Sequence, residues 1–152
     1  MMRIITGGLD DPQVIAMLKF HFDTNHAVTP PGSVHVFDLS RLKGPDVFFY
    51  SAWDGETLLG VGAFKILSPK HAEVKSMHTN KELRRFGTGA AIMLHLIDEA
   101  RARGITRLSL ETGSFDYFAP ARALYAKYGF TECAAFGDYE PDTNSTFMTR
   151  EI

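Results

Sequence analysis

The sequence predicts an α+β fold built around a mixed, mostly antiparallel sheet, and three observations support this class. Two apolar runs, Val47–Trp53 and Thr57–Leu67, are separated by a turn that contains Asp-Gly, which is typical of a β-hairpin. A third strand-like run, Ala72–Thr79, extends the hairpin into an antiparallel meander. The apolar residues of Gly87–Arg103 then recur at helical spacing, and Arg107–Glu111 again reads as a strand. This strand–helix–strand order predicts one parallel crossover within the sheet.

The N-terminal third is predicted to contain one strand and two helices. Arg3–Thr6 is short and rich in isoleucine, as expected for a first strand. Asp10-Asp11-Pro12 is typical of a helix start, and apolar residues at helical spacing extend this helix to about Asn25. The segment Asp38–Lys43 is expected to form a short second helix.

The C-terminal third is predicted to contain a last helix and two final strands. Pro120–Tyr128 is expected to be helical, because proline lies near its start and Gly129 follows its end. Phe130–Ala134 and Thr146–Glu151 are expected to be strands. The elements add up to about seven strands flanked by about four helices, in a single domain spanning residues 1–152.

The composition excludes several functional classes. Apolar residues make up 45% of the 152 residues and charged residues 22%, which is the balance of a soluble globular protein. The longest apolar runs are far shorter than the roughly 18 residues of a membrane span, and the N-terminus lacks a signal-peptide pattern. A net charge of −2 argues against general binding of nucleic acid or of a membrane surface. The single cysteine, Cys133, excludes an internal disulfide and favours a reducing, cytoplasmic location.

One group of polar residues in the first helix has side chains of the kind that bind metal ions. His21, Asp23 and His26 lie close together in the sequence. Five residues correspond to about 140° around a helix, so the two histidines diverge. They are expected to be polar surface residues, and no metal is predicted.

The most informative segment joins the strand Ala72–Thr79 to the helix that follows it. Arg84, Arg85, Gly87 and Gly89 lie at this junction. The first N–H groups of a helix lack internal partners, the helix dipole is positive there, and glycine lets a bulky anion approach them. A phosphate or diphosphate site is therefore predicted. The alternative is that the glycines form a tight turn and the arginines face solvent.

Two other phosphate-binding motifs fit less well. The P-loop pattern Gly-x-x-x-x-Gly-Lys-Ser/Thr is absent from the sequence. The dinucleotide fingerprint is matched at Gly87 and Gly89 and by the downstream acid Glu111, but Ile92 occupies its third small position. A doubly wound sheet would also need several crossovers. Dinucleotide binding therefore remains the weaker alternative.

Two motifs resemble the GNAT superfamily of N-acetyltransferases. Arg84-x-x-Gly87-x-Gly89 after a strand is similar to the family's acyl-CoA pyrophosphate loop, and Ala121–Phe130 is similar to the A-x-x-L-Y-x-K-x-G-F signature of its last helix. The resemblance covers essentially the whole chain. It implies a GNAT-like fold and direct transfer of an acetyl group from acetyl-CoA to a primary amine of a small molecule or peptide. Many members carry an asparagine where this chain has Phe118, so that cofactor contact is not carried over.

The resemblance implies acetyl-CoA contacts in two segments. The pantetheine arm is expected to pair with Ser76–Thr79 like an added strand, and the backbone N–H of Met77 to donate to the thioester oxygen. The backbone of Arg85–Ala90 is expected to hold the diphosphate. The predicted cofactor-binding residues are Met77, His78, Thr79, Arg84, Arg85, Phe86, Gly87, Thr88, Gly89 and Ala90.

The acceptor amine must lose a proton, since an alkylammonium has a pKa of roughly 10. Glu73 is the leading candidate base, and its even separation from Met77 predicts that both side chains share one face of the strand. His78 would face the opposite side and is the second candidate, and a chain of water molecules is the third. The alternative role for Glu73 is an ion pair with Lys75 or Arg84.

The remaining roles follow from the same resemblance. Tyr125 matches the family's general acid toward the CoA sulfur, and the alternative is a core tyrosine with a satisfied hydroxyl. His35, Asp38 and Glu111 are candidates for contact with the acceptor. The alternative function is a non-catalytic acyl-CoA-binding sensor or regulatory module. The partners expected are the amine and, as an alternative to a monomer, a second copy of the chain in a homodimer.

Overall fold

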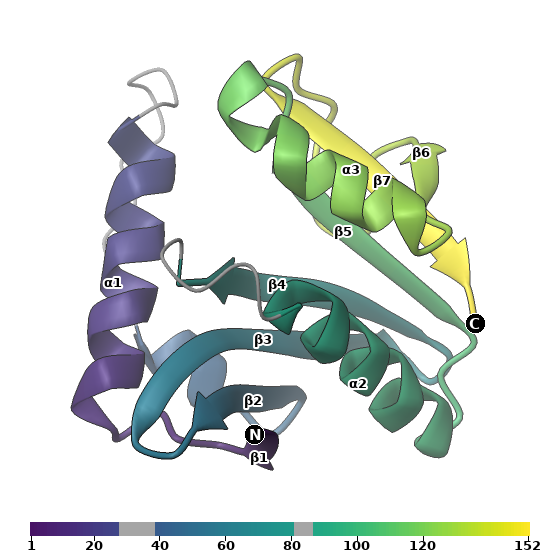
Figure 1. Ribbon diagram of the computed structural model, residues 1–152. Coiled ribbons are helices and arrows are strands. Elements are labelled where there is room, and N and C mark those ends of the chain that lie inside the picture. Colours follow the sequence, from purple (N-terminus) through teal and green to yellow (C-terminus); the bar gives the residue numbers. More distant parts are fainter. Residues whose placement is uncertain (28–38, 81–86) are drawn as a thin grey trace.

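The computed structural model of the protein describes residues 1–27, 39–80 and 87–152. These residues form one seven-stranded sheet in the order β1-β2-β3-β4-β5-β7-β6, in which β4 and β5 are parallel and the other neighbours antiparallel (Figure 1). The strands are β1 (Met2–Thr6), β2 (Val47–Asp54), β3 (Thr57–Ser68), β4 (His71–Thr79), β5 (Arg107–Gly113), β6 (Thr131–Cys133) and β7 (Ser145–Glu151). The helices are α1 (Pro12–Ala27), α2 (Thr88–Ala102) and α3 (Ala119–Lys127), with 3₁₀ helices η1 (Leu39–Lys43) and η3 (Asp116–Phe118).

The predicted fold class, the seven strands and the single parallel crossover are confirmed. The number of helices is corrected, because the described residues contain three α-helices rather than about four. The segment expected as a second helix forms the 3₁₀ helix η1, and its predicted first residue, Asp38, lies outside the described residues. A five-residue segment closed by Gly44 is short enough for 3₁₀ geometry and too short for a stable α-helix.

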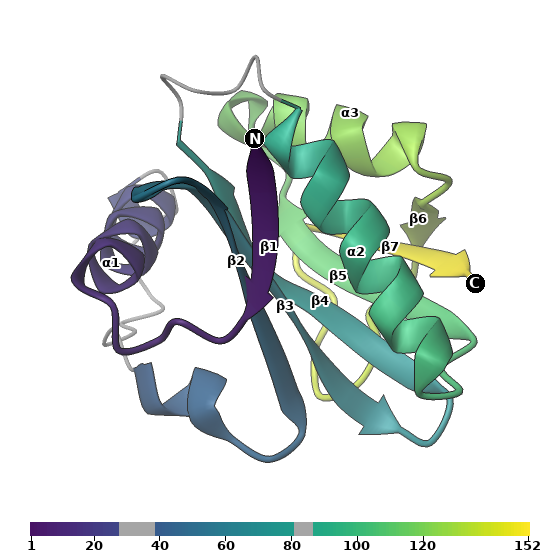
Figure 2. The ribbon, with the colours of Figure 1, turned by 60° about the horizontal axis from the view of Figure 1, so that its bottom comes forward.

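The helices cover the two faces of the sheet unequally (Figure 2). On one side α2 and α3 bury the largest core cluster, in which Ile92, Leu96 and Tyr125 contact the sheet. On the other side α1 packs Val14 and Leu18 against the first half of the sheet. We call these two sides the α2–α3 face and the α1 face.

The sheet opens into a fork between β4 and β5. Their ladder has three residue pairs and its last pair joins Glu73 to Ser109. Beyond this point β4 continues to Thr79 and β5 to Gly113, and the two strands diverge (Figure 1). In the described part of the chain no strand pairs with β4 on its β5 side beyond Glu73. This half of β4 therefore offers backbone groups to a ligand.

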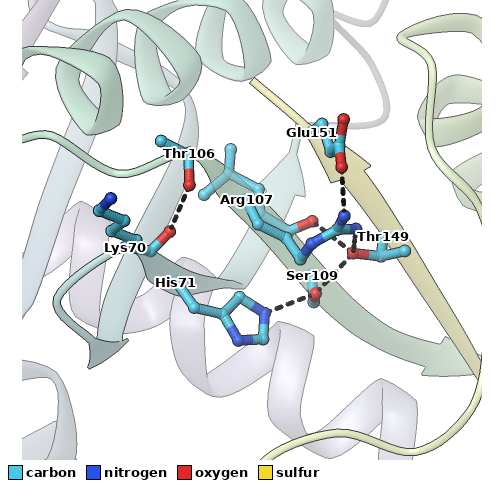
Figure 3. Close-up of polar contacts among 8 residues, drawn as sticks. Lys70, His71, Thr106, Arg107, Ser109, Thr149 and Glu151 are labelled. Carbon is cyan, nitrogen blue, oxygen red and sulfur yellow. Dashed lines mark hydrogen bonds and ion pairs between the residues drawn. The ribbon is translucent and has the colours of Figure 1, made fainter.

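A polar network closes the base of the fork (Figure 3). His71 Nε2 lies 2.7 Å from the buried Ser109 Oγ, which lies 2.9 Å from Thr149 Oγ1. Arg107 donates to Thr149 Oγ1 at 3.0 Å and to the Glu151 carboxylate at 2.8 Å. These contacts connect β4, β5 and β7 and hold the strands in place at the base of the fork. Burial, with the Arg107 charge, lowers the pKa of His71, which favours its neutral form.

β4 also contains a β-bulge just beyond the base of the fork. The single residue Gly62 of β3 faces two residues of β4, Ser76 and Met77, and Ser76 has a positive φ of 56°. Successive side chains of a strand alternate between the two faces, and one extra residue reverses this alternation. The side chains of β4 beyond the bulge therefore lie on the opposite face from the one that regular alternation along the sequence predicts.

Candidate active site

The start of α2 presents backbone donors that have no hydrogen-bond partner among the described residues. The helical hydrogen bonds begin with the Ala91 N–H, which donates to Gly87 O at 3.0 Å, so the N–H groups of Thr88, Gly89 and Ala90 precede the ladder. Gly87 has a φ of +68°, and a Cβ added there would meet nothing within 4 Å. The first turn contains no acidic residue. This end of α2 therefore has the geometry and charge to receive a phosphate group.

Two further features of this turn concern Thr88, which fits a bound ligand, and Gly89, which packs against α3. Thr88 is 1% exposed, and its Oγ1 has no hydrogen-bond partner in the part of the chain that the structure describes. A buried polar atom without a partner is costly unless something supplies the missing bond. A Cβ on Gly89 would lie 3.2 Å from Leu124 of α3, so glycine also allows α2 and α3 to approach closely.

The bulge corrects the predicted faces of β4. Lys75 lies opposite Ala63 of β3 and His78 opposite Val61, and both β3 residues pack against α1. Glu73 precedes Lys75 by two residues and therefore shares the α1 face with it and with His78.

Met77 lies on the other side. It packs against the core of the α2–α3 face, and its Sδ would lie 2.8 Å from a Cβ on Gly62. The prediction that Glu73 and Met77 share a face is therefore wrong, as is the prediction that His78 opposes Glu73. The extra residue of the bulge is the physical reason for both errors.

His78 contacts α1. Its Nδ1 lies 2.9 Å from Nδ1 of His21, and the two rings meet edge to face with centroids 4.8 Å apart. His21 is therefore packed against the end of β4, whereas the sequence predicted a polar surface position. Among the described residues no group of three His, Cys, Asp or Glu side chains is arranged to hold a metal ion.

Glu73 is 5% exposed and both of its carboxylate oxygens have partners. Its Oε2 accepts a hydrogen bond of 2.5 Å from the Tyr139 hydroxyl, and its Oε1 lies 3.8 Å from Lys75 Nζ. The predicted alternative of an ion pair with Lys75 is present, and Arg84 lies outside the described residues. Tyr139 is not among the residues predicted from the sequence, because it follows β6 in a loop without a periodic pattern.

Glu111 lies on the same α1 face of β5, next to Leu110 of the opposite face. Burial raises its pKa above the ordinary value of 4.5, and the charges of Glu73 and Asp142 act in the same direction. A hydrogen bond from Ser145 opposes this shift only in part. A carboxylate with a raised pKa is a stronger base than an exposed one.

We expect Glu111→Gln to stabilise the protein near pH 8 more than near pH 5. The pKa of this carboxyl is higher in the folded protein than in the unfolded chain, so its contribution to stability is lost as the pH rises through the folded pKa. Glutamine stays neutral throughout this range. Urea unfolding at both pH values measures the difference, with the exposed Glu132→Gln as control. An equal effect of Glu111→Gln at the two pH values would contradict the raised pKa.

Tyr125 of α3 lies in the core of the α2–α3 face. Its side chain is 8% exposed and its ring meets Phe130 edge to face at 6.1 Å. Burial, with a smaller effect of the Glu111 charge, raises the pKa of Tyr125 to about 12. Its hydroxyl makes no hydrogen bond within the described residues, which leaves the predicted alternative of a satisfied core hydroxyl without support.

Five predicted site residues lie outside the described residues: Arg84, Arg85 and Phe86 of the diphosphate loop, and His35 and Asp38 of the acceptor side. Thr79 ends β4, six residues beyond the last pair of the fork. The structure therefore brings together three groups: the start of α2, the open edge of β4, and the carboxylates of the α1 face.

Residues 14–130 match the model of the acetyltransferase (GNAT) family. The chain belongs to this family. It is 43% identical over 151 residues to the uncharacterized N-acetyltransferase YsnE of Bacillus subtilis, covering 99% of this chain and 100% of that protein. It is 40% identical over 149 residues to the uncharacterized N-acetyltransferase YedL of Escherichia coli, covering 98% and 94%.

Solved structures agree with this GNAT assignment. A crystal structure from Klebsiella pneumoniae, described as an acyl-CoA N-acyltransferase, superposes with a TM-score of 0.83 at 26% identity and covers 99% of this chain and 97% of that chain. The PaiA N-acetyltransferase of Thermoplasma acidophilum, solved with coenzyme A, gives a TM-score of 0.77 at 16% identity over 100% and 99% of the chains, which shows the shared fold. No helix in the described residues is long and apolar enough to cross a membrane.

Proposed function

We propose that this GNAT acyltransferase moves the acetyl group of acetyl-CoA to a primary amine by direct attack, with both substrates bound at once. The fork carries the proposal, because it exposes the edge of β4 between free helix donors and two carboxylates. Acetyl-CoA approaches from the α2–α3 face and the amine from the α1 face. The described elements belong to one continuous sheet, and we treat residues 1–152 as one catalytic domain.

The acetyl-CoA site is proposed at the start of α2 and along the open edge of β4. The N–H groups of Thr88–Ala90 would hold the diphosphate, and the nearby Thr88 hydroxyl, which has no partner within residues 1–27, 39–80 and 87–152, could add a further hydrogen bond. Arg84 and Arg85 would add positive charge, as the family resemblance implies. Met77–Thr79 would pair with the pantetheine arm, and the N–H of Met77 would stabilise negative charge on the thioester oxygen. The same fold holds coenzyme A in the Thermoplasma protein.

The amine is proposed to bind at the carboxylates of the α1 face. Glu73 and Glu111 favour an ammonium group there, and its deprotonation gives the nucleophile. Both carboxylates are candidate bases: Glu73 because it lies on β4, the strand proposed to carry the thioester, and Glu111 because its pKa is raised. His78 shares this face but is in contact with α1. His35 and Asp38 remain predictions for the acceptor side.

Tyr125 is proposed to donate a hydrogen bond to the departing thiolate. With a pKa of about 12 it keeps its proton at every working pH. Complete transfer of that proton to a thiolate with a pKa of about 8.5 would be uphill by about 5 kcal/mol. The proposed role is therefore stabilisation of the thiolate by a retained O–H donor, without complete proton transfer.

A thiol-release assay tests the proposed function. The protein, acetyl-CoA and a panel of primary amines (amino acids, polyamines, aminoglycosides and peptides with free N-termini) are mixed with a disulfide reagent that reports free CoA. We expect CoA release that depends on one class of amine, and kinetics that require both substrates together. Acetyl-CoA binding without release for any amine would instead support the sensor module. Comparing Glu73→Gln with Glu111→Gln identifies the base, because the variant that lacks it loses the most activity near neutral pH and also loses the acid limb of the pH profile.

A further inference from the structure

We propose that Tyr139 is a positioning residue for Glu73: its hydroxyl donates to the carboxylate and fixes the orientation of that carboxylate in the fork. The inference rests on the proposed role of Glu73 in acetyl transfer. It adds a residue from a loop that carries no recognisable motif and lies 66 residues away in the sequence.

The loop between β6 and β7 fixes the place of Tyr139. The Tyr139 ring packs edge to face on Phe136 and Phe147, with centroids 5.3 Å and 5.4 Å away. Its backbone N–H donates to Phe136 O at 3.1 Å, which closes a turn. At the other end of the loop, Ser114 of the neighbouring segment donates its hydroxyl to Thr143 O at 2.7 Å. The tyrosine is therefore held by packing and by the anchored loop, although it is 37% exposed.

The hydrogen bond from Tyr139 to Glu73 crosses the fork. Tyr139 precedes β7 and belongs to the arm formed by β5, β7 and β6, whereas Glu73 belongs to β4. Glu73 is also the last residue of β4 that pairs with β5. The contact lies at the point where the two arms separate, so it can set the direction of the Glu73 carboxylate.

The charges around Glu73 make this donor important. A nearly buried carboxylate is costly to keep ionised unless donors and positive charges surround it. Oε2 has the short phenol hydrogen bond and Oε1 has Lys75 at 3.8 Å. The charged and titratable groups around it on β3, β4, β5 and the loop are Lys65, His71, Lys75, Glu111, Tyr139 and Asp142.

Tyr139 is suited to donate throughout the working pH range. Burial and the hydrogen bond to Glu73 both raise the pKa of its hydroxyl, so the phenol keeps its proton. The nearby Glu111 charge acts in the same direction. A phenol that stays protonated supplies a constant donor to Glu73 Oε2.

The first test compares Tyr139→Phe with Tyr128→Phe, whose ring packs against the core and whose hydroxyl makes no hydrogen bond in the described residues. With the amine found in the thiol-release assay, we expect Tyr139→Phe to lower kcat by about tenfold near pH 7, the effect of losing one hydrogen bond to a charged group. The KM for acetyl-CoA should stay within about twofold. The acid limb of the kcat/KM profile should move to higher pH, because a hydrogen bond donated to a carboxylate favours its charged form.

A merely structural loop contact would lower the melting temperature without moving the acid limb. If Tyr139→Phe keeps the wild-type pH profile, the proposal is overturned whatever the change in stability. In a Glu73→Gln background, Tyr139→Phe should change kcat/KM by less than about twofold, because its partner is already gone. If Tyr139→Phe still lowered kcat/KM by about tenfold in the Glu73→Gln background, Tyr139 would not act through Glu73.

A second measurement needs no acceptor. NMR of isotope-labelled glutamate carboxyls follows the titration of Glu73, assigned by the signal missing in Glu73→Gln. We expect the midpoint to move upward in Tyr139→Phe and to stay in Tyr128→Phe. An unmoved midpoint overturns the proposal even where activity is found. A moved midpoint in a protein that transfers no acetyl group would show the contact and reject the proposed function instead.

Discussion

Gly87→Asp is expected to weaken CoA binding by at least about 30-fold, on the order of 2 kcal/mol. Gly87 directly precedes α2, and its missing side chain leaves open space beside the free N–H groups of the first turn. An aspartate there places a negative charge where the diphosphate is proposed to bind. Aspartate tolerates positive φ better than most residues, so the fold should be retained at a cost of about 1 kcal/mol.

Gly55→Asp provides a matched control. Gly55 lies in the turn between β2 and β3, has a φ of +57° and would also meet nothing within 4 Å of an added Cβ. The melting temperatures of the two variants should fall by similar amounts. Calorimetric titration with CoA should show a loss of affinity in Gly87→Asp and none in Gly55→Asp. Equal CoA affinity in Gly87→Asp and wild type would place the diphosphate elsewhere and remove the main support for the proposed cofactor site.

Local patterns predicted most of the fold because each element carries its own signal. The Asp-Gly turn at Gly55, the helical spacing that ends at Gly104 and the strand that follows it all lie where expected. The boundaries of the short elements were less well predicted. Phe130 was expected to begin a strand, but its N–H donates to Tyr125 O and its side chain is buried beside α3. Tertiary packing, which no local pattern encodes, decides such positions.

The faces of the candidate site could not be predicted for a different reason. Counting residues along β4 assumes an unbroken alternation of side chains, and the extra residue at Ser76 reverses it. The sequence around Ser76 carries no glycine or proline that would indicate a bulge. Regular alternation along β4 predicts that Glu73 shares a face with Met77. In the structure Glu73 shares its face with His78 instead.

The role proposed for Tyr139 could not be predicted from the sequence. Its contact with Glu73 depends on the path of a loop between two strands and on packing against Phe147. Neither composition nor spacing predicts a contact between residues so far apart in the chain. The motif-bearing residue Tyr125 could be predicted because its helix carries a recognisable signature, whereas its buried environment and raised pKa required the structure.

Tyr125→Phe is expected to lower kcat by about 100-fold, or about 2.7 kcal/mol of transition-state stabilisation. The KM for acetyl-CoA should stay within about twofold, since the lost hydroxyl would act on the thiolate that forms during the reaction. The melting temperature should change little. The ring still packs against Phe130, and the hydroxyl makes no hydrogen bond within the described residues.

The pH dependence of this loss separates two roles for the hydroxyl. With a pKa of about 12, Tyr125 stays protonated across the working range, so the ratio of wild-type to variant kcat should be constant between about pH 6 and pH 10. A ratio that falls toward one near pH 9 would mean that Tyr125 ionises there, which burial beside Glu111 opposes. A ratio near one at every pH would remove Tyr125 from the reaction. Tyr128→Phe, at the end of the same helix, controls for the loss of a hydroxyl from this core, and its kcat should match that of the wild type.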